Sequence, residues 1–535
     1  MTGPMGNEIR FRRISLFVIA MGIMALWASG CVKVGPDFSK PDSTVMSNWL
    51  ETGSYKQINT KTEEYRDWWQ SFNDPVLDKL IQDAYQQNLS LRIAGVRVLG
   101  AKAQLGVAIG ELYPQSQKAV GEVTKNRLSQ TSPTSGSGAP DNFWLSQTGL
   151  TASWEIDFWG KFRRAVESAD ASLMATVADY DNALVSLTGD VATSYVLLRT
   201  LEKRLSIARQ NVLVQKKSLE IATARWKGGT TSMRDVEQAL TVLNSTEATI
   251  PTLESRERQT KNALCFLMGL PPSDIGHLLG SKSAIPSPPP QVAVGIPADL
   301  MRRRPDIQSA EMRAAAQCAQ IGVNKANLYP AFSISGSFGL QASDVAPFVL
   351  GDMFQWKSRL GTIGPSFQWN LLNYGQITNQ VRFQDARFQE LVIFYQNTVL
   401  QAQREVEDAL IAFLKAQERA QKLVKAVAAA QKTVELATLQ YSEGIADFTT
   451  VLVAEQNLLS EQDSLATTLG DIAGNLVSLY RAMGGGWQIR TGHDFVPESV
   501  KKVMAQRTNW GNLLKPVPLP PPPDQPKYDI RLPEW

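Results

Sequence analysis

The sequence repeats itself at an offset of 215 or 216 residues, and this duplication limits the folds that the chain can adopt. The repeated landmarks are Tyr113-Pro114 with Tyr329-Pro330, Gly149 with Gly364, Trp154 with Trp369, Gly160 with Gly375, Gly228 with Gly444, and Met268-Gly269 with Met483-Gly484. Each copy is therefore expected to build the same succession of elements. We assign the first copy to residues 75–283 and the second to 299–486, joined by a Pro-rich linker at 284–298.

The two ends of the chain lie outside the copies. Arg10, Arg12 and Arg13 precede an apolar run at 14–27, and Ala28-Ser29-Gly30 then stand before Cys31. This order is that of a secretory signal peptide, and small residues directly before a Cys resemble a bacterial lipobox. We expect a signal peptide at 1–30 and a lipidated N-terminal segment at 31–74 that begins with Cys31; an ordinary signal peptide with an incidental Cys is the alternative. Residues 487–535 contain a Pro-rich stretch and are expected to form an extended C-terminal tail.

Each copy contains a run that predicts a very long helix. Residues 376–443 include neither Gly nor Pro, and a helix over this run would be roughly 100 Å long. Apolar residues recur in it every seven positions, at Val399, Val406, Phe413, Ala420, Val427, Val434 and Tyr441, and the first copy repeats the pattern from Leu184 to Leu219. This pattern is typical of a coiled coil and favours a rod or a helical barrel. Shorter helices are expected at about 75–112, 232–268, 305–328 and 448–483.

Residues with period-two alternation precede each long helix. In 331–340 the side chains of Ser333, Ser335 and Ser337 alternate with apolar ones, and in 363–371 those of Ser366 and Gln368 do the same. The first copy shows the alternation most clearly at 150–156. Segments of this kind are typical of membrane β-barrels, apolar toward lipid and polar toward the lumen; a soluble amphipathic sheet is the alternative. In a barrel, the five polar side chains would line the lumen.

The number of expected strands sets a condition on assembly. Two strands per copy give four per chain, whereas the smallest membrane barrels have about eight. An open sheet edge would leave backbone groups unpaired in lipid. Several copies of the chain must therefore share one barrel. Two copies would give about eight strands, whose side chains nearly fill the interior, and three would give about twelve, which leaves room for a lumen.

Charge balance and the scarcity of reactive side chains exclude several classes of function. Lys and Arg number 54 against 51 Asp and Glu, which gives no electrostatic reason to expect nucleic-acid binding. The chain has 2 His and 3 Cys, so we expect no metal site and no cofactor. The sequence contains no phosphate-binding loop, dinucleotide fingerprint, nucleophile elbow or HExxH motif, so we do not expect an enzyme. Cys265 and Cys318 are interpreted as core thiols, with a redox pair as the alternative.

Two signatures make the chain similar to a known family. The first consists of Trp68-Trp69, Phe72, Asp74-Pro75, Leu77, Leu80, Ala84 and Asn88. The second consists of Arg302-Arg303-Arg304-Pro305-Asp306-Ile307, Ala310-Glu311, Ala314-Ala315, Ile321-Gly322 and Tyr329-Pro330. Together with the repeat and the lipobox, they resemble the TolC-like outer-membrane efflux proteins over about 31–486. The resemblance is strongest to the lipoprotein branch that serves inner-membrane proton-driven pumps.

The resemblance implies a mixed α+β membrane protein. It implies a homotrimer in which four β-strands per chain form a shared twelve-stranded β-barrel in outer-membrane lipid, above a long coiled-coil α-barrel in the periplasm. Such a trimer is a passive exit for substrates that an inner-membrane proton-driven efflux pump and a periplasmic adaptor protein deliver. A protein-secretion duct and a pore-less structural coiled-coil lipoprotein are the alternatives. Arg303, Arg304, Pro305 and Asp306 are implied to be structural and to pack the start of the second copy.

The turns between each long helix and its return helix are interpreted as the periplasmic tip and gate. The residues assigned to them are Gly228, Gly229, Asp235, Tyr441, Gly444 and Asp447. We expect Gly228 and Gly444 to adopt positive φ, and Ser232 or Asp447 to cap the return helices. The resemblance matches Asp235 and Tyr441 to positions with closing polar contacts. We expect the Tyr441 hydroxyl to donate to Asp235; packing of Tyr441 in the helix seam is the alternative.

Overall fold

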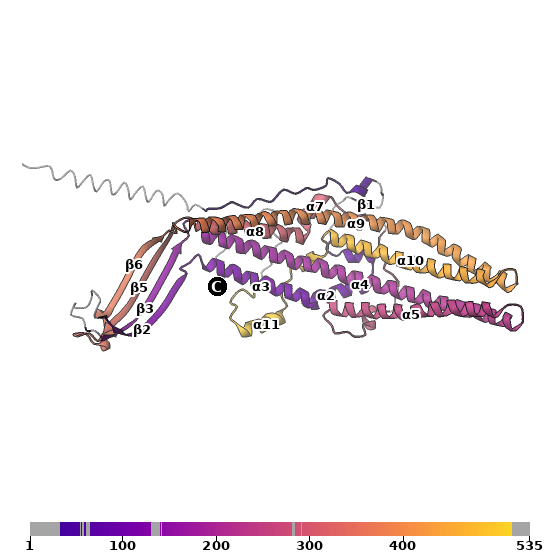
Figure 1. Cartoon of the computed structure of the whole chain (residues 1–535), viewed down its shortest axis with the longest axis horizontal. Helices are drawn as coiled ribbons and strands as arrows, with labels where there is room; N and C mark the ends of the chain where they lie inside the picture. The colour runs from indigo at the N-terminus through magenta and orange to yellow at the C-terminus, as the bar shows by residue number, and fades with distance from the viewer. Residues whose placement is uncertain are drawn as a thin grey trace, which may run out of the picture.

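The computed structural model describes residues 33–53, 55, 58–59, 65–129, 140, 142–280, 284–289 and 291–515. The expected signal peptide, Cys31 and residues 516–535 of the expected tail lie outside this part of the chain. The molecule is elongated, with a sheet at one end and two helical hairpins that turn at the other (Figure 1). Strands and long helices therefore occupy opposite ends of one molecule.

The sheet has two strands from each copy, as the sequence predicts. Its strands are β2 (Ser116–Arg127), β3 (Asn142–Ile156), β5 (Ala331–Ser343) and β6 (Arg359–Gln368), antiparallel throughout in the order β2-β3-β5-β6. The last strand differs from the expected 363–371, because it begins at Arg359 and ends at Gln368. Beyond that end, the Trp369 indole donates to the carbonyl of Leu328, at the end of the helical part, with a distance of 3.0 Å.

Two hairpins form the opposite half of the molecule. The first pairs α4 (Lys161–Lys227) with α5 (Met233–Leu267), and the second pairs α9 (Tyr374–Ser442) with α10 (Phe448–Ala482). Both long helices are uninterrupted, with 67 residues in α4 and 69 in α9. Heptad positions such as Leu184 and Val191 of α4, and Val399 and Val406 of α9, are buried. The predicted long helices are therefore confirmed, and their apolar stripes pack against neighbouring helices.

The segment expected as one helix at 75–112 is two helices, α2 (Pro75–Gln87) and α3 (Leu89–Gly110). Asn88 separates them, because its side-chain oxygen caps α3 by accepting from the N–H of Leu91 at 2.8 Å. Its amide also donates to the carbonyl of Leu267 at 2.8 Å. Within the described residues, α3 alone is long and apolar enough to cross a membrane, with a mean hydropathy of 1.3.

The remaining elements are short, except α8, which packs against α4 and α9. They are η1 (Leu50–Gly53), β1 (Ile58–Asn59), η2 (Trp68–Phe72), α6 (Gly276–Leu279), β4 (Val292–Ala293), α7 (Pro297–Arg303), α8 (Pro305–Ala326), η3 (Leu350–Phe354), η4 (Trp356–Ser358), η5 (Trp487–Arg490) and α11 (Glu498–Arg507).

Residues of the second signature, Arg304 to Asp306, stabilise the start of α8 and attach it to neighbouring helices. Pro305 occupies the first turn, where its missing N–H costs nothing. Arg304 donates to both carboxylate oxygens of Asp306, at 3.0 and 2.7 Å, and to the carbonyl of Ala482 at 2.8 Å. It also forms an ion pair with Glu405 of α9 at 2.8 Å. This one guanidinium therefore joins α8, α9 and the end of α10.

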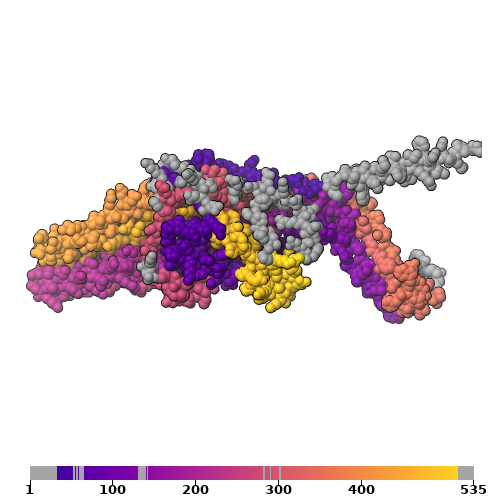
Figure 2. Space-filling view, turned by 180° about the vertical axis from the view of Figure 1, so that it is seen from behind, coloured from indigo at the N-terminus to yellow at the C-terminus, as the bar shows by residue number. Residues whose placement is uncertain are grey.

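The expected extended tail is wrong for residues 487–507, which form η5 and α11 against the helices. A buried ion pair between Arg490 and Asp181 of α4 attaches this segment. The backbone of Phe495 approaches Gly95 of α3 so closely that a Cβ at Gly95 would lie 2.1 Å from the Phe495 carbonyl oxygen. Figure 2 shows the segment, in yellow, protruding midway along the molecule.

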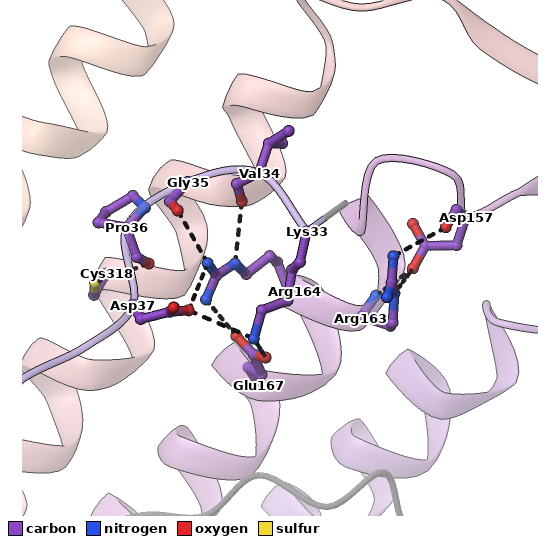
Figure 3. Close-up of polar contacts among 10 residues, drawn as sticks. All are labelled: Lys33, Val34, Gly35, Pro36, Asp37, Asp157, Arg163, Arg164, Glu167 and Cys318. Atoms are coloured by element: carbon purple, nitrogen blue, oxygen red, sulfur yellow. Dashed lines mark hydrogen bonds and ion pairs between the residues drawn. The ribbon is translucent and has the colours of Figure 1, made fainter. Parts of the chain in front are cut away.

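Residues 33–50, here called the N-terminal strap, run along the outside of α4, α8 and α9. Near its start, the buried Arg164 side chain of α4 donates to the carbonyls of Val34 and Gly35, both at 3.1 Å (Figure 3). Further along, Gln403 of α9 donates to the carbonyl of Thr44 at 3.0 Å. The strap is thus bound through side-chain contacts to its backbone.

The two cysteines in the described part of the chain are free and have separate surroundings. Cys318 lies under the strap, with Sγ 3.7 Å from the carbonyl oxygen of Pro36, and burial raises the pKa of its thiol to about 11. Cys265, at the end of α5, has Sγ 3.7 Å from the carbonyl oxygen of Ser273. This arrangement fits the core-thiol interpretation better than the redox pair.

Candidate functional site

One face of the sheet is polar along its whole width. The strand register brings together three cross-strand rows of side chains: Glu155, Ser333 and Ser366; Ser116, Ser153, Ser335 and Gly364; and Lys118, Thr151, Ser337 and Thr362. The hydroxyls of Ser337 and Thr362 are 2.8 Å apart. Gln368 follows Ser366 on the same face. The five residues expected to line a lumen therefore share one face.

The opposite face is apolar, and no other described element of the chain covers it. Its rows are Ile156, Phe332 and Phe367; Trp154, Ile334 and Pro365; and Leu150, Phe338 and Gly361 with Ala119. Ile363 is 85% exposed and Phe367 70%. A contiguous apolar surface of this kind needs an apolar environment. A sheet with these two faces is typical of a membrane β-barrel, in which the apolar face contacts lipid and the polar face contacts water.

Two glycines on the polar face let the central strands approach closely. Gly149 of β3 lies opposite Gly339 of β5. A Cβ at Gly149 would lie 2.7 Å from the Cα of Gly339, and one at Gly339 would lie 2.5 Å from the carbonyl oxygen of Thr148. A side chain at either position would therefore collide with backbone. Glycine inside a strand often marks a close approach or bend, as a sheet curving toward its polar face requires.

Aromatic side chains stand where the strands meet the helices. In each copy a tryptophan indole donates to a backbone carbonyl at the end of a helix: Trp154 to Leu112 at 3.2 Å, and Trp369 to Leu328 at 3.0 Å. Trp159 stacks on Tyr329 with ring centroids 4.6 Å apart. At the far end of the sheet Trp144, Phe348, Phe354 and Trp356 are exposed. Aromatic girdles at both ends are typical of a membrane-spanning strand set.

In the first of the two hairpin turns, the glycine with positive φ is not the predicted one. Gly444 has φ of 77°, as predicted, but Gly228 has φ of −77° and the left-handed residue is Gly229, with φ of 72°. Gly229 and Gly444 are 215 residues apart, so Gly229 is the structural counterpart. Asp447 caps α10 by accepting from the N–H of Thr450 at 3.1 Å, whereas Ser232 makes no such side-chain bond at α5. Thr450 also keeps the pKa of Asp447 below its usual value.

The expected hydrogen bond between Tyr441 and Asp235 is not formed. Asp235 instead accepts a hydrogen bond from the hydroxyl of Thr231. The Tyr441 hydroxyl is buried, and burial raises its pKa. The Tyr441 ring packs on Phe448 with centroids 4.9 Å apart. The packing alternative therefore describes Tyr441 better than the hydrogen-bond hypothesis does.

Sequence reasoning missed the residue that links the two turns. Arg225 of α4 donates to the backbone carbonyl of Tyr441, and its guanidinium lies over the Tyr441 ring, 4.6 Å from the centroid. A Cβ at Gly444 would come within 3.6 Å of the same guanidinium. The available signal was spacing, since Arg204, Asn211, Ser218 and Arg225 are seven residues apart. They form a polar stripe beside the apolar one.

These features define a class: a channel subunit whose membrane barrel is completed by other copies and continues into a helical tube. The outer membrane efflux protein family model matches residues 80–270 and 296–485, so the chain belongs to this family. Members of the family are outer-membrane efflux channels and not enzymes. The chain is accordingly an outer-membrane protein with an efflux-channel role.

Several relatives match most of the chain. Nodulation protein T of Rhizobium leguminosarum bv. viciae is 30% identical over 478 residues, which cover 88% of this chain and 94% of the relative. The pyoverdine export outer membrane protein OpmQ of Pseudomonas putida is 31% identical over 428 residues, covering 79% and 88%. The toluene efflux pump outer membrane protein TtgI of Pseudomonas putida is 28% identical over 491 residues, covering 90% and 99%.

Solved channels have the same architecture. The outer-membrane channel OprN superposes with a TM-score of 0.79 at 30% identity, over 85% of this chain and 99% of that one. VceC of Vibrio cholerae gives a TM-score of 0.71 at 29% identity, over 79% and 100%. The expected fold class is confirmed: a mixed α+β membrane protein with the fold of the trimeric channels, in which each chain gives four strands to a shared barrel and long helices to an α-barrel.

Proposed function

We propose that three copies of the chain form a passive exit from the periplasm to the outside. The proposal rests on the four-stranded sheet with one polar and one apolar face, in which the outer edges of β2 and β6 pair with no other described strand. Unpaired backbone groups are costly in lipid, so these edges need partners. Three copies pair them all and surround the polar face of Ser333, Ser335 and Ser337 with a water-filled lumen.

Two measurements test the assembly and the pore. Mass measurement of the detergent-solubilised protein should give three chains, and the same sample should conduct ions in planar bilayers. A stable monomer with native circular dichroism contradicts the trimer. Trimers that do not conduct, even after the tip is loosened by Arg225→Ala, favour a pore-less coiled-coil lipoprotein.

The proposed partners are a periplasmic adaptor protein and an inner-membrane proton-driven efflux pump. Three relatives support small organic substrates, because their names refer to pyoverdine export, solvent efflux and toluene efflux. A protein-secretion duct is the competing role. Deleting the gene and measuring both the intracellular accumulation of small toxic compounds and the secreted proteins separates the two. Higher accumulation with an unchanged set of secreted proteins supports efflux, and the reverse supports secretion.

Lipidation of Cys31 is part of the proposal. The bound strap supports it, since Val34 donates its N–H to the carbonyl of Trp159 at 3.0 Å, next to the aromatic girdle at the helix end of the sheet. Three residues span at most about 11 Å, so an acylated Cys31 would reach lipid at that depth. Metabolic labelling with a palmitate analogue should mark the wild type and not Cys31→Ser. Equal labelling of both proteins removes the claim.

The hairpin turns are proposed as the gate, through the residues Gly228, Gly229, Asp235, Tyr441, Gly444 and Asp447. Contacts between the two turns support this assignment, because a closed tip must hold the first hairpin to the second. We add Arg225 to these gate residues because it contacts Tyr441 of the second hairpin.

A further inference from the structure

The two hairpins meet along α4 and α10 through a line of polar contacts. Arg204 donates to both carboxylate oxygens of Asp463, at 2.6 and 3.0 Å, and Asn211 donates to the side chain of Gln462 at 2.8 Å. Seven residues further along α4, Ser218 donates to Oε1 of Glu455. Apolar side chains accompany this line, both within a hairpin, as with Leu205 of α4 and Leu253 of α5, and across the two hairpins near their turns, where Val236 of α5 and Phe448 of α10 belong to one cluster.

Glu455 is the member of this line whose hydrogen bonding is incomplete. Its side chain is only 2% exposed, and Oε2 is buried without a hydrogen-bond partner among the described residues. Gln215, one turn before Ser218 on α4, is also 2% exposed, and neither of its amide atoms has a partner in that part of the chain. Facing helices therefore enclose a carboxyl group with one unbonded oxygen and an amide with neither atom bonded. Burying such an incompletely bonded carboxyl costs less when it is protonated than when it is ionised.

Among the residues that the structure describes, no opposite charge stabilises an ionised Glu455. The polar group of α4 that bonds Glu455 is the Ser218 hydroxyl. Burial raises the pKa of Glu455 above the usual value for glutamate. Of the charged side chains on the adjoining helix stretches, Lys216 of α4 pairs with Glu247 of α5 at 3.0 Å, and Lys432 pairs with Glu435 on α9 at 3.0 Å. Lys217 and Glu220 of α4 are exposed to solvent. Asp463, two turns along α10, is bound by Arg204. A buried carboxylate without a countercharge is unfavourable.

We propose that Glu455 is a proton-sensitive latch between the two hairpins, protonated when α10 lies against α4 and ionised when water enters the contact. The proposal rests on the proposed gating of the channel by movement of the hairpin ends. Because ionisation is easier in the hydrated state, proton binding stabilises the closed contact. A rise in pH through the closed-state pKa then favours opening.

The test compares conductance in planar bilayers as a function of pH for the wild type, Glu455→Gln and the control Glu435→Gln. Glu435 is an exposed acid on α9, so its variant controls for loss of a charge. Wild type and Glu435→Gln should gain conductance as pH rises above the usual range of glutamate. Glu455→Gln, which keeps shape and stays neutral, should remain at the low-pH conductance throughout. A flat wild-type profile, or an unchanged profile in Glu455→Gln, overturns the latch.

A second measurement reads the proton directly and does not depend on channel activity. Infrared difference spectra of the full-length detergent-solubilised protein should show the carbonyl band of a protonated buried carboxyl at a pH just above the usual range of glutamate, lost in Glu455→Gln and kept in Glu435→Gln. Absence of a band assignable to Glu455 at every pH overturns the latch. If the wild type does not conduct at all, the channel proposal fails, and this band still decides the protonation of Glu455.

Discussion

Arg225 on the first hairpin holds Tyr441 on the second by two contacts at once, a hydrogen bond to its backbone carbonyl and a guanidinium over its ring at 4.6 Å. The bond uses the last turn of α9, whose carbonyls have no partners within the helix. A positive charge is also favourable near a helix C-terminus. Arg225 therefore stabilises the end of one hairpin from the other.

Removing this contact should loosen the tip. A hydrogen bond from a charged donor contributes about 1.5–3 kcal/mol, and the proposed trimer has three such contacts. Arg225→Ala is expected to raise single-channel conductance at an unchanged trimer yield. Arg209→Ala is the control, because Arg209 pairs with Glu254 within the first hairpin at 2.8 Å. Equal conductance in the two variants would show that Arg225 does not restrain the tip.

Two substitutions at Tyr441 should separate packing from hydrogen bonding. Tyr441→Phe keeps the ring on Phe448 and removes a hydroxyl that does not bond Asp235, so we expect a change of no more than about 1 kcal/mol, the net contribution of one hydrogen bond. Tyr441→Ala removes a buried ring, and such truncations cost about 3–5 kcal/mol. Conductance and thermal unfolding of the trimer measure both. A large opening effect of Tyr441→Phe would restore the hydrogen-bond hypothesis.

The repeat and the two kinds of periodicity were enough to predict the two long helices, their return helices and the four strands, because each pattern depends on neighbours close in sequence. Apolar heptads gave α4 and α9, and alternation gave the faces of β3 and β5. The turn glycine was misassigned because the landmarks use offsets of both 215 and 216, and a shift of one residue separates Gly228 from Gly229. The turn conformation of Gly229 follows the offset of 215.

Contacts between distant segments were beyond sequence reasoning. The partner of Arg225 depends on how the two hairpins are rotated about each other, which no local pattern specifies. The same holds for α11, whose position depends on a buried ion pair between Arg490 and Asp181 across 309 residues. The Pro-rich composition of the chain's end led to the prediction of an extended tail, and α11, which precedes the prolines, was therefore not predicted.

The central glycines of the sheet should tolerate no side chain. Gly339→Ala would bring Cβ to 2.5 Å from the Thr148 carbonyl oxygen, and overpacking of this kind costs about 1–3 kcal/mol. We expect a lower dissociation temperature of the trimer on gels. Gly361→Ala is the control, because its Cβ would meet neighbours at 3.5 Å, an ordinary contact, on the apolar face. Similar dissociation temperatures for both variants would contradict a close approach of β3 and β5.

The strap should detach when its clamp is removed, whether or not Cys31 is lipidated. Arg164 is buried and bonds the carbonyls of Val34 and Gly35 as well as Glu167. Each bond from a charged donor contributes about 1.5–3 kcal/mol, so Arg164→Ala should expose the strap to proteases that leave the wild type uncut. The strap offers Lys33 as a trypsin site, whereas the bond after Lys40 is resistant because Pro41 follows it.

The matched control for this experiment is Lys161→Ala, since Lys161 lies in the first turn of α4, near the clamp, and pairs with Glu155 at 3.1 Å. Trypsin should cut the Arg164→Ala trimer near its N-terminus and spare the Lys161→Ala trimer, with mass spectrometry locating the cleavage. Cys31→Ser should stay protected, because the clamp uses no atom of the lipid anchor. Cleavage in Cys31→Ser but not in Arg164→Ala would mean that the anchor, and not Arg164, holds the strap on the helices.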